Sequence, residues 1–506
     1  MLNKLRSVWA GLLMLSLLVA PDIGLAQRTN NPSLIGLAPK QKIAGDELVR
    51  TMSADGSSNA TRVGDVMDDL IARRSGILTS AIRGFPVAFS GDSFMSSAYG
   101  GVSSPASATP TSATGISLTN NSPQNWLRYI FRERFYTDQS LSTAVGGMGL
   151  QHLNDVQLPI IQALAPPIDI VNCGTNDFGT VATVLTASQM TALARSYVTA
   201  ANKVGTLVIW ASVLPQSSWN AAQRQKAAEF NRQLWLMARD SSLKMVFVDL
   251  APTMIDYSTG NVKAAFLAAD NVHLLIAGWQ AMAQAIQPTL DKYLPPVSAA
   301  DLLPIDANDS FDATLAPSGN MHPAGMFAGN SSGLATNWYL AGIAGTVTAT
   351  PTKGTDATLT TLPTQIVTLG GTADGNSPRL EFNLTPGTNF TNTLGAGDRV
   401  YAEVDISATG LTAVRAVSIV LQVTSGGITK TYIDGTYANV NGQATGNLPA
   451  SFTALLHTPP MVLEGSVTAV RCYVFYQTAS SGSLAGAIAH SRLSIRKAGL
   501  VAGVSQ

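Results

Sequence analysis

Apolar residues in the first half of the chain form two kinds of pattern that alternate with each other. Short continuous apolar runs lie at 86–89, 168–171, 206–210 and 244–248, and stretches with helical spacing lie at 124–135, 187–204, 220–239 and 275–290. Strands that alternate with helices are typical of βαβ units and a parallel sheet. Continuous apolar strands also fit a sheet that is covered on both faces. The pattern therefore predicts an α/β domain over residues 83–295.

A different pattern begins near residue 320, where apolar and polar residues alternate with a period of two. Val400, Val404 and Ile406 alternate with polar neighbours, as in a strand with one buried face. Similar runs lie at 365–369, 379–384, 414–423, 428–432, 452–456, 467–476 and 488–495. Short strands separated by Gly, Asn and Thr turns predict an all-β sandwich over 320–506, joined to the α/β domain by a linker at 296–319.

Residues 1–26 have the pattern of a signal peptide. Lys4 and Arg6 form a charged start, residues 8–20 are apolar, and Gly24-Leu25-Ala26 places small residues where a signal peptidase reads the chain. The apolar run is shorter than the roughly 20 residues that a membrane-spanning helix needs. We therefore expect an exported protein, periplasmic or extracellular, without stable membrane insertion.

Residues 27–82 form a polar lead-in to the α/β domain. Ala54-Asp55-Gly56 is flanked by runs at 47–49 and 61–63, which predicts a hairpin, and a helical pattern follows at 66–71. The segment resembles a short stretch found near the start of phage tail and receptor-binding proteins. That resemblance keeps a binding role open beside an enzymatic one.

The composition argues against a nucleic-acid partner and against a Cys-rich metal site. Charged residues make up 12% of the chain and the formal net charge is zero, whereas a typical soluble domain has roughly 25% charged residues. A chain without basic excess cannot neutralise a phosphate backbone, so we expect no nucleic-acid partner. The two cysteines, Cys173 and Cys472, are too few for a disulfide framework or a Cys-rich metal site. We expect two buried free thiols in preference to one bridge, and no metal.

Polar residues just after the predicted strands are the candidates for chemistry, because sites in an open α/β sheet form at the carboxyl ends of its strands. Gly91-Asp92-Ser93 follows the first strand. Glycine permits a tight strand-to-helix turn, and free N–H groups at a helix N-terminus favour the negative charge that develops on a nucleophilic hydroxyl. Taken alone, this tripeptide is more typical of an ordinary turn and helix cap.

Two further elements lie in the same predicted domain. Gly174-Thr175-Asn176-Asp177 follows the second long apolar run, where the Asn176 amide can donate to an oxyanion, although these are also common turn residues. Asp270-Asn271-Val272-His273 precedes the last helix. At a spacing of three in a helical turn, the carboxylate can orient the imidazole. A helix cap beside a surface histidine explains that last element equally well by itself.

The three elements are more informative together than singly, because each supplies a different requirement of nucleophilic catalysis. They provide a nucleophile, an oxyanion donor and an oriented base in one domain. Three unrelated caps would not need to be complementary in this way. The sequence therefore predicts Ser93 as nucleophile, His273 as general base and Asp270 as the partner of His273.

With these blocks the sequence resembles the SGNH/GDSL hydrolase family over roughly residues 84–295. The glycine block that the family also carries matches 144–148, with Gly147 as the glycine. The resemblance implies a flavodoxin-like three-layer α/β/α fold, attack of Ser93 on an ester carbonyl, and no cofactor. It also implies an oxyanion hole made of the Ser93 and Gly147 N–H groups and the Asn176 amide. The supporting motif positions are Gly91, Asp92, Gly174 and Asp177.

The expected substrate is a short-chain ester, most simply an acetyl ester on a polysaccharide, because the β-sandwich resembles the jelly-roll modules of secreted carbohydrate-active enzymes. Two alternatives stay open. A lipid esterase or thioesterase would need a deep apolar acyl channel, and a surface-binding protein could retain the hydrolase fold without catalysis. Residues 100–122, rich in Ser, Ala, Thr and Gly, form an insertion that we expect to border the site and shape the substrate cleft. The alternative is a disordered loop.

Overall fold

The computed structural model describes the larger part of the chain. These residues are 48–52, 58–62, 85–96, 98, 115–137, 139–178, 184–294, 320–322, 327–355, 363–382, 394–438 and 445–498. The predicted signal peptide, the predicted helix at 66–71 and the linker at 296–319 lie outside them. The predicted hairpin is confirmed: β1 (Leu48–Met52) pairs antiparallel with β2 (Ser58–Arg62). The hairpin belongs to a different unit from residues 81–499.

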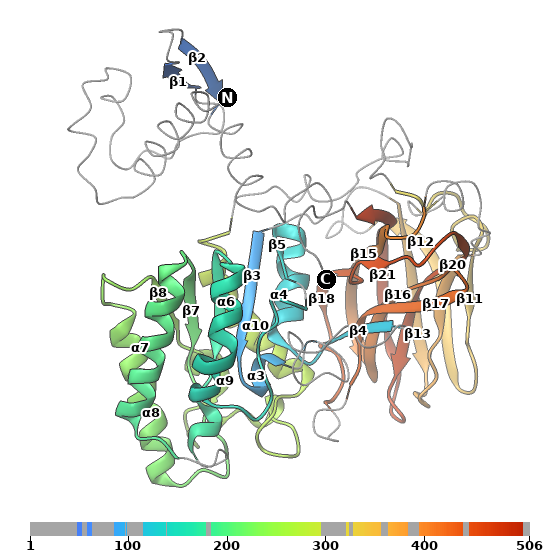
Figure 1. Cartoon of the computed structure of the whole chain (residues 1–506). Coiled ribbons are helices and arrows are strands. Elements are labelled where there is room, and N and C mark those ends of the chain that lie inside the picture. Colours follow the sequence, from blue (N-terminus) through green and yellow to red (C-terminus); the bar gives the residue numbers. More distant parts are fainter. Residues whose placement is uncertain are drawn as a thin grey trace. The chain divides into compact units, whose positions relative to one another are not determined.

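A parallel sheet forms the centre of the α/β region (Figure 1), with the strand order β5-β3-β6-β7-β8. The strands are β3 (Phe85–Gly91), β5 (Phe135–Tyr136), β6 (Ile168–Asn172), β7 (Leu207–Ala211) and β8 (Met245–Val248). The chain enters at β3, moves to one side and then continues on the other, which is the flavodoxin-like order. In that order the carboxyl ends of β3 and β6 border the crevice where ligands bind.

Helices cover both faces of this sheet. One face is covered by α4 (Pro123–Phe131) and α10 (Ile276–Leu290), and the other by α6 (Leu158–Leu164), α7 (Ala187–Lys203) and α8 (Ala221–Met237). Phe89 lies in the first hydrophobic cluster and its neighbour Ala88 in the second, because successive strand residues point to opposite faces. The predicted three-layer α/β/α arrangement is therefore confirmed.

Local sequence signals set the helix boundaries. Thr186 and Asn220 form capping boxes at the starts of α7 and α8. The predicted helix at 124–135 is too long: Arg132 takes a φ of 57° and ends α4, and the two-residue strand β5 was missed. The short elements are α3 (Ser93–Ser96), η1 (Arg132–Arg134), α5 (Leu150–His152), the π-helical η2 (Leu153–Gln157), η3 (Thr175–Phe178), α9 (Ala251–Met254), β9 (Ile255–Asp256), β10 (Asn261–Val262) and η4 (Ala264–Phe266).

The C-terminal region is the predicted β-sandwich, with two sheets in the part of the chain that the structure describes. One sheet has the order β11-β14-β20-β16-β17-β4 and the other β12-β13-β21-β15-β18, with β19 beside β15. The strands of the first sheet are β4 (Gly115–Thr119), β11 (Trp338–Ala341), β14 (Arg379–Phe382), β16 (Val414–Ser425), β17 (Ile428–Thr436) and β20 (Val467–Thr478). Those of the second are β12 (Val347–Thr355), β13 (Pro363–Gly371), β15 (Arg399–Thr412), β18 (Phe452–His457), β19 (Met461–Val462) and β21 (Ala485–Ala498).

Strand β4 joins the α/β region to the sandwich. It arises in the insertion at 100–122, where the sequence predicted no strand, and it pairs in parallel with β17, with Ile116 opposite Tyr432. Edge pairing satisfies backbone groups that a loop would leave to water, and neither β4 nor β17 shows this partnership in its own sequence. The chain therefore passes from the helix that begins at Ser93 into the sandwich and back into α4.

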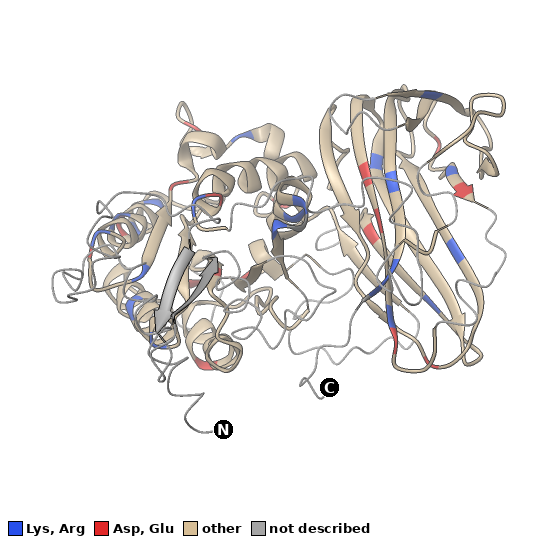
Figure 2. Ribbon diagram, turned by 90° about the horizontal axis from the view of Figure 1, so that it is seen from above, with Lys and Arg blue, Asp and Glu red and all other residues tan. Residues whose placement is uncertain are grey.

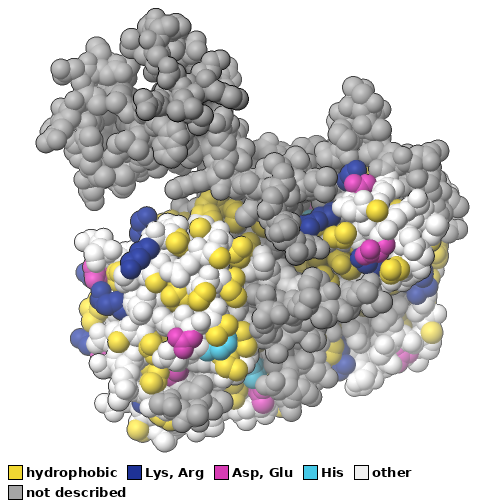
Figure 3. All heavy atoms as spheres, viewed as in Figure 1, with side chains coloured by type: hydrophobic (Ala, Val, Ile, Leu, Met, Phe, Trp, Pro, Cys, Tyr) yellow, Lys and Arg dark blue, Asp and Glu magenta, His cyan; other side chains and the backbone are white. Residues whose placement is uncertain are grey.

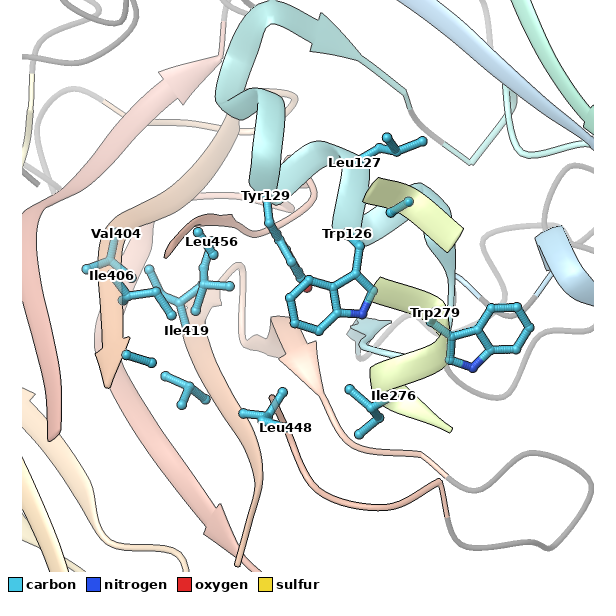
Figure 4. Close-up of a cluster of buried hydrophobic side chains, with 14 of the residues drawn as sticks. Trp126, Leu127, Tyr129, Ile276, Trp279, Val404, Ile406, Ile419, Leu448 and Leu456 are labelled. Atoms are coloured by element: carbon cyan, nitrogen blue, oxygen red, sulfur yellow. The ribbon is translucent and has the colours of Figure 1, made fainter. Parts of the chain in front are cut away.

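One continuous hydrophobic cluster extends from α4 and α10 into both sandwich sheets (Figure 4). The ring centroids of Trp126 on α4 and Phe452 on β18 lie 5.4 Å apart. A hydrogen bond also joins α4 to the sandwich next to this core: the Tyr129 hydroxyl donates to Asp434 Oδ1 at 2.9 Å. Residues 81–499 accordingly form one compact unit, and the sandwich is packed on the α/β region.

The surface matches the low charge of the composition. Lys, Arg, Asp and Glu occupy a small part of the ribbon (Figure 2), and several of them form ion pairs, such as Glu403 with Arg496. Uncharged side chains predominate on the described part of the face in Figure 3. Cys173 and Cys472 are both buried and free, as expected. Among the described helices, we find none with the length and apolar character needed to cross a membrane.

Candidate active site

The turn after β3 presents Ser93 at the crevice. Gly91 has a φ of 133°, and a Cβ at this position would lie 1.9 Å from the Asn172 carbonyl oxygen, so only glycine fits between the two strands. Asp92 Oδ1 accepts from the Phe94 N–H at 3.1 Å, and the Asp92 carbonyl accepts from the Met95 N–H at 3.0 Å. Ser93 is thereby fixed as the first residue of α3, half-buried beyond the carboxyl end of β3.

The structure brings Ser93, His273 and Asp270 together in one chain of contacts. Ser93 Oγ lies 3.0 Å from His273 Nε2, and His273 Nδ1 lies 2.6 Å from Asp270 Oδ2. Each distance is within hydrogen-bond range. Ser93 and His273 are separated by 180 positions in the sequence, so only the fold places them side by side. The order of the contacts is that of a nucleophile, a base and an orienting acid.

The Asp270–His273 segment differs from the predicted helical turn. It precedes α10 as a non-helical turn in which Asn271 has a φ of 59°, a conformation that Asn tolerates better than most residues. Asp270 Oδ1 accepts from the backbone N–H groups of Val272 and His273 at 3.0 and 2.9 Å. These bonds leave Oδ2 for the imidazole, so the pair forms without helical geometry.

The charge state of Asp270 follows from the same contacts. Partial burial raises the pKa of Asp270, but the hydrogen bonds from the His273 ring and from the Val272 and His273 N–H groups outweigh it and hold the pKa below its ordinary value. Asp270 is therefore ionised near neutral pH. An ionised carboxylate at Nδ1 favours a proton on that nitrogen, which leaves Nε2 as the acceptor facing Ser93.

The glycine block and the Asn176 block meet beside the Ser93 turn. Asn176 donates from Nδ2 to the Met148 carbonyl at 2.9 Å, a contact that sequence reasoning missed because Met148 carries no chemical signal. Gly147 is exposed with a φ of 77°. A Cβ built on Gly146 would lie 3.9 Å from Ser93 Cβ, whereas one on Gly147 would have no neighbour within 4 Å. Gly146 therefore lies closer to Ser93 than Gly147 does.

Gly174 and Asp177 serve the packing of these loops. Gly174 has a φ of 126°, and a Cβ there would lie 3.0 Å from the Phe230 ring. The Asp177 carboxylate accepts from the Leu150 N–H at 3.0 Å and so anchors the end of the glycine block. A Cβ on Gly149 would lie 2.5 Å from that carboxylate. Both motif residues therefore hold the loops around Ser93 in place.

Buried carboxyl groups lie beneath the site. Burial raises the pKa of Asp92 to about 7, although the Phe94 N–H opposes the shift, and the nearby Asp177 carboxylate raises it further. Burial also raises the pKa values of Asp169 and Asp177 to about 6. Near pH 5 these carboxyls bind protons that they would release in the unfolded chain. In the described residues no cluster of His, Cys, Asp and Glu is suited to hold a metal ion.

The substitution Asp92→Asn is expected to stabilise the protein increasingly as pH rises from 5 to 8. A carboxyl whose folded pKa of about 7 exceeds the ordinary value of 3.8 contributes stability at low pH that is lost as pH rises through 7. Asparagine keeps the acceptor for Phe94 and has no proton to lose. In thermal unfolding, the melting temperature of Asp92→Asn minus that of the wild type should increase by roughly 3 °C or more between pH 5 and 8.

The exposed Asp240 provides the control for this experiment. Hydrogen bonds from Ser242 and Arg195 lower the pKa of Asp240 to about 2, so its titration lies below the range tested. The melting-temperature gap for Asp240→Asn should therefore stay constant between pH 5 and 8. A constant gap for Asp92→Asn as well would contradict the assignment of a buried, protonated carboxyl.

Solved structures similar to part of this chain include several esterases and lipases. A family 3 carbohydrate esterase from Clostridium thermocellum is 16% identical, with 42% of this chain and 100% of that chain covered and a TM-score of 0.31. A GDSL-like lipase from Bacteroides thetaiotaomicron is 16% identical, with 45% and 98% covered and a TM-score of 0.30. A mutant of an acetyl-xylooligosaccharide esterase from a Geobacillus is 17% identical, with 41% and 95% covered and a TM-score of 0.31. No protein-family model and no curated protein sequence matches the chain.

Proposed function

We propose that this chain is an exported serine esterase that hydrolyses short-chain esters, principally acetyl esters carried by a polysaccharide. The observation that carries the proposal is the contact chain from Ser93 Oγ through His273 to Asp270, with distances of 3.0 and 2.6 Å. A serine hydroxyl is a weak nucleophile unless an adjacent base accepts its proton. Here the base is in contact with the hydroxyl and is itself oriented by a carboxylate.

The proposed reaction proceeds through an acyl-enzyme. As Ser93 Oγ attacks the ester carbonyl, His273 Nε2 takes the hydroxyl proton, and Asp270 stabilises the imidazolium that results. The tetrahedral intermediate collapses, and the alcohol leaves with the proton from His273. Water then attacks the acyl group with His273 again as base, which releases the acid and regenerates Ser93.

The oxyanion of the intermediate needs donors close to Ser93. The backbone N–H of Ser93, the glycine block and the Asn176 amide are the groups that the fold gathers there. The Asn176 amide directs one N–H to the Met148 carbonyl and has a second N–H, because a primary amide carries two. We assign the oxyanion to these donors, whose removal one at a time typically costs about 10²–10³ in kcat.

The substrate half of the proposal rests on the β-sandwich. It shares a hydrophobic core with the α/β region, and Ile276, the first residue of α10, donates its N–H to the Thr445 carbonyl of the sandwich at 2.8 Å. The sandwich therefore reaches within three residues of His273. A β-rich surface held this close to the base can present a polymer to it, whereas a tethered module would only raise the local concentration.

The test is hydrolysis of p-nitrophenyl esters from acetate to palmitate, together with acetate release from acetylated xylan. We expect fast cleavage of the acetate ester, a steep fall beyond butyrate, and acetate release from the polymer. A preference for long acyl chains would replace the proposal with a lipid esterase. Absence of any hydrolysis above the Ser93→Ala background would instead favour a binding protein that retains the hydrolase fold.

A further inference from the structure

We propose that Gln157 is a positioning residue that holds the nucleophile turn in its reactive geometry. The inference rests on the proposed function and identifies a residue outside the motif blocks. Gln157 lies at the end of the π-helical segment η2 and is fully buried. A π-helical turn within a helix is rare and frequently occurs at functional sites.

The Gln157 side chain binds both backbone polar groups of Gly91. The Gly91 N–H donates to Gln157 Oε1 at 2.8 Å, and Gln157 Nε2 donates to the Gly91 carbonyl at 2.8 Å. A backbone N–H can only donate and a carbonyl can only accept, so the amide orientation is unambiguous. This paired arrangement imitates the peptide group of a neighbouring strand.

On this side of β3 near its carboxyl end, the neighbour is the segment 141–145, which bridges to β3 at Phe89 and donates the Val145 N–H to the Gly91 carbonyl. The Gly91 N–H has its acceptor in Gln157 Oε1. Strand β5 pairs with β3 only at Phe85 and Pro86, while β6 accompanies β3 on the other side as far as Gly91. A buried backbone group without a partner costs about 1–3 kcal/mol. The Gln157 amide therefore completes the sheet edge at the residue from which the Ser93 turn departs.

The Gly91 carbonyl also links the turn to the glycine block. It accepts from the Val145 N–H at 3.0 Å, so Gln157 and Val145 share one acceptor. Ser93 lies two residues beyond Gly91, and Gly146 follows Val145 directly. A shift of Gly91 would consequently move the nucleophile and its oxyanion donors together, and displacement by about 1 Å can cost about 10²-fold in rate.

A buried hydrogen-bond network supports the strand just before this point. Ser90 Oγ donates to Asp169 Oδ1 at 2.8 Å and lies 2.7 Å from Thr143 Oγ1, and the Tyr197 hydroxyl donates to Asp169 Oδ2 at 2.5 Å. These contacts hold Ser90, whereas Gln157 holds Gly91 at both of its polar groups. The network and the glutamine thus fix successive residues of the strand end.

The experiment compares Gln157→Met with Gln124→Met. Methionine keeps the length and flexibility of glutamine and removes its hydrogen bonds. Gln124 is the matched control because it is also buried, and its Nε2 donates to Ser142 Oγ at 2.7 Å without touching Gly91. Both variants should lose similar stability. We expect only Gln157→Met to lose kcat for p-nitrophenyl acetate, by about 10- to 100-fold, with KM within twofold.

A second readout is the rate at which a fluorophosphonate labels Ser93, which reports the geometry of the nucleophile without turnover. It should fall for Gln157→Met in parallel with kcat. If Gln157→Met does not fold, Gln157→Glu keeps the volume and the acceptor for the Gly91 N–H, and we expect a loss of about 3- to 10-fold.

The outcomes separate this inference from the proposed function. A wild-type protein that neither hydrolyses esters nor reacts with the fluorophosphonate would remove the proposed function itself. An active wild type with an equally active, folded Gln157 variant would overturn the positioning role alone. Equal losses of kcat in the Gln157 and Gln124 variants would also overturn it, because they would indicate a general effect of core polarity.

Discussion

Replacing Ser93 by alanine is expected to lower kcat/KM for p-nitrophenyl acetate by about 10⁴- to 10⁶-fold, the range seen when a nucleophile of this kind is removed. The physical reason is that Ser93 Oγ lies 3.0 Å from His273 Nε2, so alanine removes the hydroxyl that this base contacts. Residual activity would come from the oxyanion donors and from substrate binding alone. Initial rates at saturating and subsaturating ester give kcat and KM separately.

The double variant Ser93→Ala, His273→Ala should be hardly slower than either single variant. Residues that act as one unit show strongly non-additive effects, because removing the first member already abolishes the work of the second. Ser96, in the same short helix α3, supplies the control, and Ser96→Ala should retain activity within a few-fold. Additive losses for Ser93 and His273 would show that the two residues do not act together.

Replacing Trp126 by alanine is expected to lower the free energy of unfolding by about 3–5 kcal/mol, the usual cost of deleting a fully buried Trp. The α/β region and the sandwich should lose this stability together. Trp126 is 1% exposed, packs on Phe452 of β18, and donates from its indole to the Asn120 carbonyl at 3.0 Å beside β4. Its removal opens the core at the boundary between the two regions.

Amide hydrogen exchange measures the loss of stability separately in the α/β region and in the sandwich. Amides of β6 and β7 report the α/β sheet, and amides of β15 and β16 report the sandwich. Protection should fall by the same free energy in both, because one cluster of buried side chains spans them. Trp235, which is 45% exposed on α8, is the control, and Trp235→Ala should change stability by no more than about 0.5 kcal/mol.

The opposite result would be a sandwich whose protection is unchanged while that of the α/β sheet falls. It would mean that the two regions unfold independently, as domains joined by a linker do. The position of the sandwich beside His273 would then contribute nothing to the stability of the site. The substrate half of the proposed function would lose its structural basis, and the Ser93 chemistry would be unaffected.

The sequence by itself determined the local elements and the chemical types. Continuous apolar runs located β3, β6, β7 and β8, because these strands are buried on both faces, and helical spacing located the long helices, because one face of each is buried. Gly91, Ser93, Asn176, Asp270 and His273 could be singled out since each stands next to a predicted element and has a distinct chemical role. The alternation beyond residue 320 similarly revealed the strands of the sandwich.

Contacts between distant segments were decided only by the tertiary structure. The pairing of β4 with β17 and the two hydrogen bonds of Gln157 to Gly91 leave no periodic pattern, because both depend on backbone groups that every sequence contains. The shared core at Trp126 depends on side chains from segments far apart in the sequence. The turn at Asp270–His273 differed from a helix because the Asp270 side chain accepts from the backbone N–H groups of Val272 and His273. Residue types can therefore be read along the chain, but the partner of a backbone N–H or carbonyl is fixed only when the chain has folded.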